Sequence, residues 1–395
     1  MTDALKRRIG PGLLTAYGVG VMIGAGIYVL VGAVAADAGV WAPLAFALAG
    51  LIAAPTALSY AEFSTRIPEA AGEAAFVGAG FNTQAMALLV GLAIVAAGTM
   101  SAGAILRGGV GYSLAIVAAD PVLMTLVLGL LLTGVAVVGV LESLSLVAVF
   151  TAIEVAGLAL VIWAGSTGAP SADYIAPAAI VWPGVAMGGV LAFFAFIGFE
   201  DIVNMAEEVE HPTRTMPKSI LWALAITSAI YALVAWAAVR VVPLPLLGGS
   251  ESPLALVWET GRGGDARFLS SIAVFATLNG VLAQIVMASR VLYGLGRRTP
   301  ALAVFHHGHP RFGTPVLATV LIGGATIILS LAGDVAGLAG ITTAILLSVF
   351  VLVNFALILQ KRRALEAPFR VPMAVPVTGF VLSLGALVLT IGGNL

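Results

Sequence analysis

The sequence predicts an all-α protein that crosses a membrane many times. Of its 395 residues, 61% are hydrophobic and only 9% are charged, whereas soluble domains carry about 25% charged residues. The apolar residues gather in eleven segments, each close to the roughly 20 residues that a membrane-spanning helix needs. Glycine interrupts two of these segments near the depth of the membrane centre, in a glycine-rich stretch of the first and at one glycine followed by two acids in the sixth, which sets them apart from plain spans.

The eleven segments give the expected element boundaries. They lie at about 13–36, 42–61, 84–106, 121–139, 145–165, 185–206, 219–242, 269–292, 314–332, 335–359 and 371–392. The first five spans (about 13–165) and the next five (about 185–359) form two halves, and the span at about 371–392 is an addition. Because no low-complexity linker divides the halves, residues 1–395 are expected to form a single transmembrane domain.

Positive charge predicts how the chain is oriented. With the N-terminus in the cytoplasm, the outward-facing segments hold Lys or Arg only at Arg107, Arg240, Arg262 and Arg267. The other Lys and Arg residues then face inward, as the positive-inside rule requires. The first apolar run spans about 24 residues, longer than the core of a signal peptide, so it is interpreted as a retained span. We expect a multi-pass protein of the cell membrane with its C-terminus outside.

The first span is interrupted within residues 18–27, which read GVGVMIGAGI. Each glycine costs a helix about 1 kcal/mol relative to alanine, and backbone that leaves the helix inside a membrane must find other partners. Amides around Gly24, Ala25 and Gly26 would suit a carboxylate, because a helix N-terminus is partly positive. Carbonyls around Met22 would suit an ammonium group. Close helix packing is the alternative reason for the glycines.

The sixth span is interrupted within residues 193–201, which read FFAFIGFED. Two interrupted spans in corresponding positions of two halves are the best sequence indication of a transporter binding site. Carbonyls near Phe196 and Ile197 could complete an ammonium site. The rings of Phe194, Phe196 and Phe199 could wall a side-chain pocket, although aromatic residues in membrane helices also serve as plain packing.

Two carboxylates lie at membrane depth, Glu154 in the fifth span and Glu200 at the second interruption. A carboxylate there is costly and is functional by default. Glu200 could gate the site or hold a proton, or it could cap the freed helix end. Glu154 has no Lys or Arg at its depth, so we expect it to be neutral for part of a cycle and able to carry a proton. A permanently protonated carboxyl that donates one hydrogen bond is the alternative.

Few other residues indicate chemistry. Thr277 and Asn279 in the eighth span could line a cavity, or they could join helices. His306, His307 and His309 lie close together in a loop rich in arginine, so a solvated loop is favoured over a metal site. The chain has no cysteine and a net charge of -1 without a basic tail. We therefore expect no metal, no cofactor and no nucleic-acid partner, and no enzyme, since no nucleophile and base are paired.

On these residues the chain resembles the amino acid–polyamine–organocation (APC) superfamily of transporters over nearly its whole length. Residues 20–28 are similar to the family's first signature, and residues 196–200 followed by 207–218 are similar to its second. Residues 68–76 resemble the family's segment between the second and third helices. Residues 107–112 resemble a stretch of cationic amino acid transporters and their bacterial relatives.

The resemblance implies a LeuT-type 5+5 inverted-repeat fold with the first and sixth spans broken and substrate between spans one, three, six and eight. It implies that the turn at residues 24–26 holds the substrate carboxylate. It also implies that carbonyls at Met22 and Ile197 take the amino group, with Phe194 beside the substrate. Glu200 matches a gating acid of some exchangers. Glu154 aligns with a lysine that replaces sodium in some proton-coupled relatives, and an acid cannot replace sodium by charge.

We therefore predict a secondary active permease that takes up small neutral amino acids by alternating access, coupled to protons in preference to sodium. The alternatives are an amino acid/amine exchanger and a non-transporting membrane amino acid sensor. The expected binding residues are Met22, Ile23, Gly24, Ala25, Gly26, Phe194, Phe196, Ile197 and Phe199, with Glu154 and Glu200 for gating or proton coupling and Thr277 and Asn279 as cavity-lining candidates.

Overall fold

The computed structural model describes residues 9–23, 26–67, 72–139, 144–177, 179–205, 208–363 and 366–392. These residues are almost entirely helical, and they contain no strand beyond an isolated bridge between Ile9 and Val209. In chain order the elements are α1 (Pro11–Ile23), α2 (Ile27–Ala38), η1 (Gly39–Trp41), α3 (Ala42–Arg66), α4 (Gly72–Phe81), α5 (Gln84–Leu114), α6 (Pro121–Val138), α7 (Leu144–Thr167), α8 (Ala172–Ile175), α9 (Trp182–Phe194), η2 (Asp201–Met205), α10 (Pro212–Val241), α11 (Leu244–Gly248), α12 (Pro253–Arg262), α13 (Arg267–Arg298), η3 (Pro300–Phe305), α14 (Val316–Ala332), α15 (Val335–Arg363) and α16 (Ala374–Gly392).

The helices have the length and surface of membrane spans. Within the described ranges, eight helical stretches are long and apolar enough to cross a membrane: Ile27–Arg66, Gln84–Leu114, Pro121–Val138, Ala148–Thr167, Pro212–Val241, Arg267–Arg297, Val335–Arg363 and Ala374–Gly392. Three shorter apolar helices, α1, α9 and α14, accompany them. Large apolar side chains such as Leu130 of α6 and Val388 of α16 are more than half exposed, as lipid-facing residues should be. The prediction of an all-α membrane protein is confirmed.

Local sequence explains where the helices begin and end. Asp120 precedes α6, and its carboxylate accepts the Leu123 N–H at 2.9 Å, which satisfies one of the free donors of the first turn. Gly139 ends the same helix with a φ of 75°, a left-handed conformation that glycine adopts at no steric cost. Several other helices begin with proline in the first turn, where its missing N–H is not needed.

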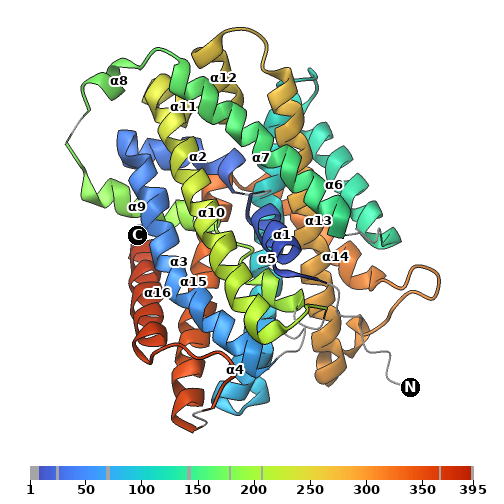
Figure 1. Ribbon diagram of the computed structural model, residues 1–395. Coiled ribbons are helices and arrows are strands. Elements are labelled where there is room, and N and C mark those ends of the chain that lie inside the picture. Colours follow the sequence, from blue (N-terminus) through green and yellow to red (C-terminus); the bar gives the residue numbers. More distant parts are fainter. Residues whose placement is uncertain are drawn as a thin grey trace.

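Helices of the first half of the chain pack against helices of the second half. In Figure 1 the pairs are α2 with α9, α3 with α10, α5 with α13 and α6 with α14. The centre of the molecule is therefore built from segments far apart in the sequence. The buried aromatic side chains gather there, including Phe46, Tyr60, Phe196, Tyr231 and Phe350.

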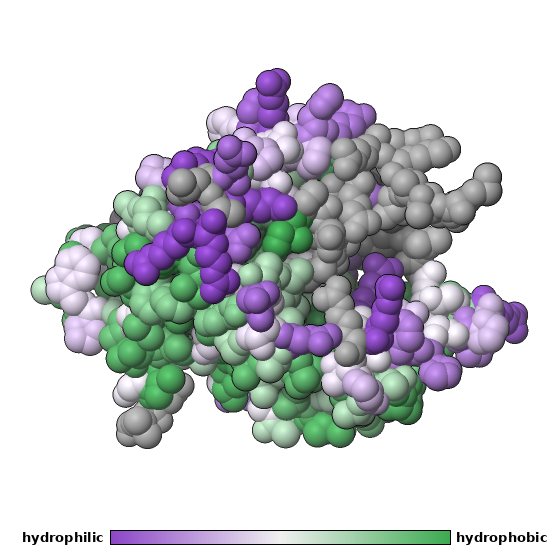
Figure 2. Space-filling model, turned by 90° about the horizontal axis from the view of Figure 1, so that it is seen from below, coloured by the Kyte–Doolittle hydropathy of each residue, from purple (hydrophilic) through white to green (hydrophobic). Residues whose placement is uncertain are grey.

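The two ends of the helix bundle differ in character. Short helices α8, α11 and α12 cover the upper end in Figure 1, whereas α4 and the connection between α15 and α16 lie at the lower end. Hydrophilic side chains gather on the lower face, which Figure 2 shows from below. The region between the expected spans at 42–61 and 84–106 is partly helical, because Glu62 and Arg66 belong to α3 and α4 follows separately.

A buried ion pair joins three segments at this lower end. The Lys361 ammonium of α15 contacts both carboxylate oxygens of Glu62 on α3, at 3.0 and 2.7 Å. It also donates to the Val371 carbonyl at 2.6 Å, and the Val371 N–H donates to Glu62 at 2.9 Å. Arg66 adds a second cation at 2.7 Å from Glu62. Because every partner is satisfied, the charges are tolerated although Glu62 and Lys361 are almost fully buried.

Candidate functional site

The first break is the interval between α1 and α2. α1 ends at Ile23 and α2 begins at Ile27, and the expected ligand residues Gly24 and Ala25 lie outside the described residues. Gly26 stands at the start of α2, where no side chain caps the helix. A Cβ atom at Gly26 would collide with the backbone of Ala195, so glycine is required at this position. Met22 and Ile23, at the end of α1, are fully buried.

The second break comprises residues 195–200, between α9 and η2. α9 ends at Phe194 and the chain continues in tight turns, with Gly198 at a φ of 121° that favours glycine. A Cβ at Gly198 would lie 2.7 Å from Val21 Cγ1 of α1. The carboxylate of Glu200 accepts the Gly198 N–H at 2.9 Å, which satisfies backbone that the helix has released. This break thus presses against α1 and carries its own acceptor.

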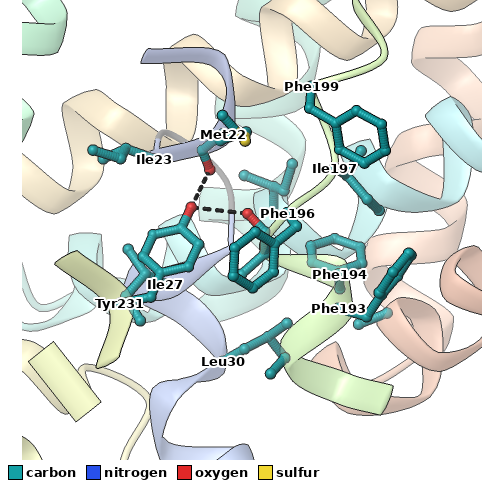
Figure 3. Packing of buried hydrophobic residues seen from close by; sticks show 14 of the residues in the cluster. Met22, Ile23, Ile27, Leu30, Phe193, Phe194, Phe196, Ile197, Phe199 and Tyr231 are labelled. Carbon is teal, nitrogen blue, oxygen red and sulfur yellow. Dashed lines mark hydrogen bonds between the residues drawn. The ribbon is translucent and has the colours of Figure 1, made fainter. Parts of the chain in front are cut away.

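Tyr231 of α10 connects the two breaks. Its hydroxyl lies 2.7 Å from the Met22 carbonyl and 2.8 Å from the Ala195 carbonyl, as the dashed lines of Figure 3 show. One hydroxyl proton is therefore shared between the carbonyl that ends α1 and the carbonyl that follows α9. The sequence analysis did not single out Tyr231. A tyrosine hydroxyl in the middle of a membrane span needs a hydrogen-bond partner, and this was the signal that could have indicated it.

Two further tyrosines hold the segment after the first break. The Tyr112 hydroxyl of α5 donates to the Tyr28 carbonyl of α2 at 2.7 Å and accepts the Leu254 N–H of α12 at 3.2 Å. The Tyr28 hydroxyl in turn donates to the backbone carbonyl of Glu154 on α7 at 2.9 Å. α2 is thus tied by hydroxyl groups to two spans and to the helices that cover the upper end.

The three phenylalanines expected to wall a side-chain pocket do not share one neighbour. The ring of Phe196 packs against Tyr231, with centroids 5.2 Å apart, and Phe199 packs against Tyr60 at 5.7 Å. Phe194 is buried next to Phe193, and both rings are labelled in Figure 3. Ile197, expected as a carbonyl acceptor, lines a small cavity next to the second break. Once the backbone leaves the helix at Ala195, helical spacing no longer determines where these side chains point.

Glu154 lies in the interior beside Asn279. The Glu154 side chain is fully buried, and neither carboxylate oxygen has a hydrogen-bond partner within standard distance among the described residues. The Asn279 side chain of α13 is the polar neighbour that acts on this carboxyl. Thr277 is different, because its hydroxyl donates to carbonyls of its own helix and faces Gly109 of α5. The structure brings Glu154 and Asn279 together and leaves Thr277 in helix packing.

Comparison with known proteins identifies relatives over most of the chain. The family described as amino acid permease matches residues 13–394. The branched-chain amino acid permease BcaP of Bacillus subtilis is 27% identical and covers 95% of this chain and 85% of its own length. An uncharacterised transporter of Mycobacterium tuberculosis is 32% identical, over 86% of this chain and 77% of that protein. Cationic amino acid transporter 9, chloroplastic, of Arabidopsis thaliana is 31% identical, and the matched region spans only 58% of that longer protein.

Proposed function

Because this chain belongs to the amino acid permease family, we propose that it is a secondary transporter that takes up small neutral amino acids by alternating access, coupled to protons. The observation that carries this proposal is the meeting of two helix breaks at the centre of the bundle, where Gly26 touches Ala195 and Tyr231 joins Met22 to Ala195. Interrupted helices that meet at mid-membrane are the usual substrate site of such transporters.

The two poles of an amino acid fit the first break. The N-terminus of α2 has no side-chain cap at Gly26, so its backbone N–H groups and partial positive charge suit the substrate carboxylate. The substrate ammonium group would donate hydrogen bonds to the carbonyls of Met22 and Ala195. The Ile197 carbonyl is the other predicted acceptor. Because Tyr231 already donates to two of these carbonyls, the hydroxyl and the ammonium group would share them.

The helix arrangement supports a 5+5 inverted repeat with eleven spans. In this interpretation α1 with α2 is the first span and α9 with η2 is the sixth. The observed pairs, α2 with α9, α3 with α10, α5 with α13 and α6 with α14, then join spans one and six, two and seven, three and eight, and four and nine. Matched pairing of this kind is what two related halves would produce. α16 is the additional eleventh span.

Charge and side-chain character support the remaining details. The hydrophilic lower face of Figure 2 is the proposed cytoplasmic side, and the distribution of Lys and Arg supports an N-terminus inside and a C-terminus outside. Phe194, Phe196, Ile197 and Phe199 are buried and apolar, which favours a neutral substrate. The relatives include both a branched-chain permease and cationic transporters. Glu154 and Glu200 are the proposed proton-coupling groups.

Uptake into proteoliposomes tests this proposal. Radiolabelled L-leucine, L-alanine and L-lysine would be offered without sodium, with and without an inward proton gradient, to liposomes that are empty or preloaded with amino acid. Accumulation of leucine or alanine only with the gradient is the expected result. Uptake only into preloaded liposomes would indicate an exchanger. Uptake that requires sodium would indicate sodium coupling in place of proton coupling. Binding without flux would indicate a sensor.

A further inference from the structure

A small closed cavity lies beside the second break, on the side facing α4. Its free space for the centre of a water molecule is ≈ 10 Å³, about the volume needed to hold one water. Six polar side chains line it, from five different parts of the chain: Glu73 of α4, Ser101 of α5, Glu200 and Asp201 of the second break and η2, Gln284 of α13 and Thr342 of α15. The sequence analysis assigned no role to Glu73, Ser101 or Gln284.

Two of these side chains carry a buried oxygen that is not hydrogen-bonded. The Ser101 hydroxyl and the Gln284 carbonyl oxygen lack any hydrogen-bond partner among the described residues, and the two residues are only 1% and 5% exposed. Leaving a buried polar group unpaired is costly, so such groups in native proteins generally face a ligand or an ordered water. Because both line the same cavity, that cavity is suited to a small polar guest.

The charge around the cavity is entirely acidic. Glu73, Glu200 and Asp201 interact electrostatically with one another, and no Lys, Arg or His of the described chain lines the space. From α3, the Tyr60 hydroxyl also acts on Glu73, and α5, α13 and α15 contribute no titratable group. Burial, with Asp201 nearby, raises the pKa of Glu73 to about 7. Neighbouring carboxylates of this kind hold a proton in preference to ionising together.

We propose that this cavity is a proton-binding site in which Glu73, Glu200 and Asp201 share a proton through a water molecule held by Ser101 and Gln284. Glu200 ties the site to the second break, because its carboxylate also accepts the Gly198 N–H. A rearrangement of that break would move Glu200 and change how tightly the proton is held. The role of this proton in coupling rests on the proposed transport function, whereas proton binding itself does not.

The size of the cavity favours a proton and water over a larger cation. An ammonium or guanidinium group at the end of a substrate side chain would not fit a space sized for one water molecule without movement of the walls. Such a group remains the competing occupant, because an acidic cavity next to Ile197 could receive the end of a cationic amino acid. The two occupants predict different results for L-lysine.

Infrared difference spectroscopy of the detergent-purified protein tests the site without requiring transport. The carbonyl stretch of protonated carboxyl groups would be followed while pH is varied, in the wild type and in Glu73→Gln. Glu210→Gln is the matched control, since Glu210 is an exposed acid that does not line the cavity. We expect the wild type and the control to show a titration step near pH 7, and Glu73→Gln to lose it.

Ser101→Ala gives a second, smaller change that preserves every carboxyl group. Removing the hydroxyl should shift the same titration step while leaving its amplitude unchanged. An unaltered step in both Glu73→Gln and Ser101→Ala would overturn the proposal. Loss of L-lysine binding in Glu73→Gln, with L-leucine binding retained and no titration step in the wild type, would assign the cavity to a substrate side chain. A titration step in a protein that transports nothing would leave the site standing and the proposed function refuted.

Discussion

The two helix breaks meet in space but satisfy their backbone in different ways. The second break supplies much of its own pairing, because Glu200 accepts the Gly198 N–H and the turns from 195 onward form short-range backbone bonds, while its Ala195 carbonyl receives the Tyr231 hydroxyl from another helix. The first break depends on other helices, since Tyr231 binds the Met22 carbonyl and no side chain caps α2 at Gly26. A segment that brings its own carboxylate has little need of another. The difference supports the proposal that the substrate carboxylate binds at the first break.

The largest effect is expected where the breaks touch. Gly26→Val would drive a side chain into the backbone of Ala195, and such overpacking costs about 1–3 kcal/mol, roughly five- to 150-fold in substrate affinity. Gly134→Val on α6 is the control, because a Cβ there meets nothing within 4 Å. Equilibrium binding of radiolabelled substrate measures both. Wild-type affinity in Gly26→Val would remove the first break from the binding site.

The next effect concerns the residue that joins the breaks. Tyr231→Phe leaves the carbonyls of Met22 and Ala195 without their hydroxyl donor, and an unpaired buried acceptor costs about 1–3 kcal/mol. Thermal unfolding should show that loss in the absence of substrate. Bound substrate should restore part of it, because its ammonium group can take over the two carbonyls. Tyr293→Phe in the last turns of α13 is the control, and equal behaviour of the two variants would contradict the bridge.

Glu200 distinguishes a backbone cap from a charged gate. Glu200→Gln keeps an oxygen that can accept the Gly198 N–H, whereas Glu200→Ala removes it. We expect the alanine variant to lose about 1 kcal/mol of stability and the glutamine variant to keep wild-type stability. Chemical or thermal denaturation reports this split. If both variants lost the same stability, charge and not hydrogen bonding would hold the second break.

A variant of Glu154 tests whether this residue carries a proton during uptake. Glu154→Gln removes the ionisable group beside Asn279 without changing its size. We expect the variant to fold normally and to lose or shift the pH dependence of uptake. The initial rate of uptake into proteoliposomes, measured from pH 5 to 8, checks this. A pH profile identical to that of the wild type would leave Glu154 as a structural side chain.

The smallest expected effect is on how the stability of the folded protein depends on pH. Burial raises the pKa of Glu73 from 4.5 to about 7, so the folded protein binds this proton more tightly than the unfolded chain does. The associated stability is fully present below pH 4.5, falls as pH rises towards 7 and levels off above it. The apparent melting temperature should therefore decline over that interval in the wild type. Glu73→Gln should flatten the decline, and Glu210→Gln should not.

Those features of the fold that depend on apolar length and composition were predictable from sequence. Hydrophobic runs located the membrane helices. Glycine located both interruptions, because it is one of the few features that mark a helix break in an apolar sequence. The end of α3 was placed too early, at about residue 61. Glu62 and Arg66 read as loop residues, whereas the helix continues to Arg66 because Lys361, about 300 positions later, neutralises Glu62. Only the folded structure reveals such a pairing.

The site was less predictable than the fold because irregular backbone has no periodicity. The sequence could name Phe196 and Phe199, but not that the turns at 195–200 send them to different neighbours. Tyr231 and Glu73 were not assigned roles, because Tyr231 lies within an apolar span with no motif around it and Glu73 falls between two expected spans. Whether the named residues bind substrate remains a prediction that the variants above can decide.

The ion pair between Glu62 and Lys361 has a mechanical consequence. It joins α3, α15 and the segment at Val371 that precedes α16 through buried hydrogen bonds and charges. Separating such charges without new partners costs several kcal/mol. A proposed transport cycle that broke the pair on every turnover would be slowed by that cost. These three segments should therefore travel as a single rigid body. In the proposed alternating-access cycle, we therefore expect the hinge to lie between that body and the helices that carry the breaks.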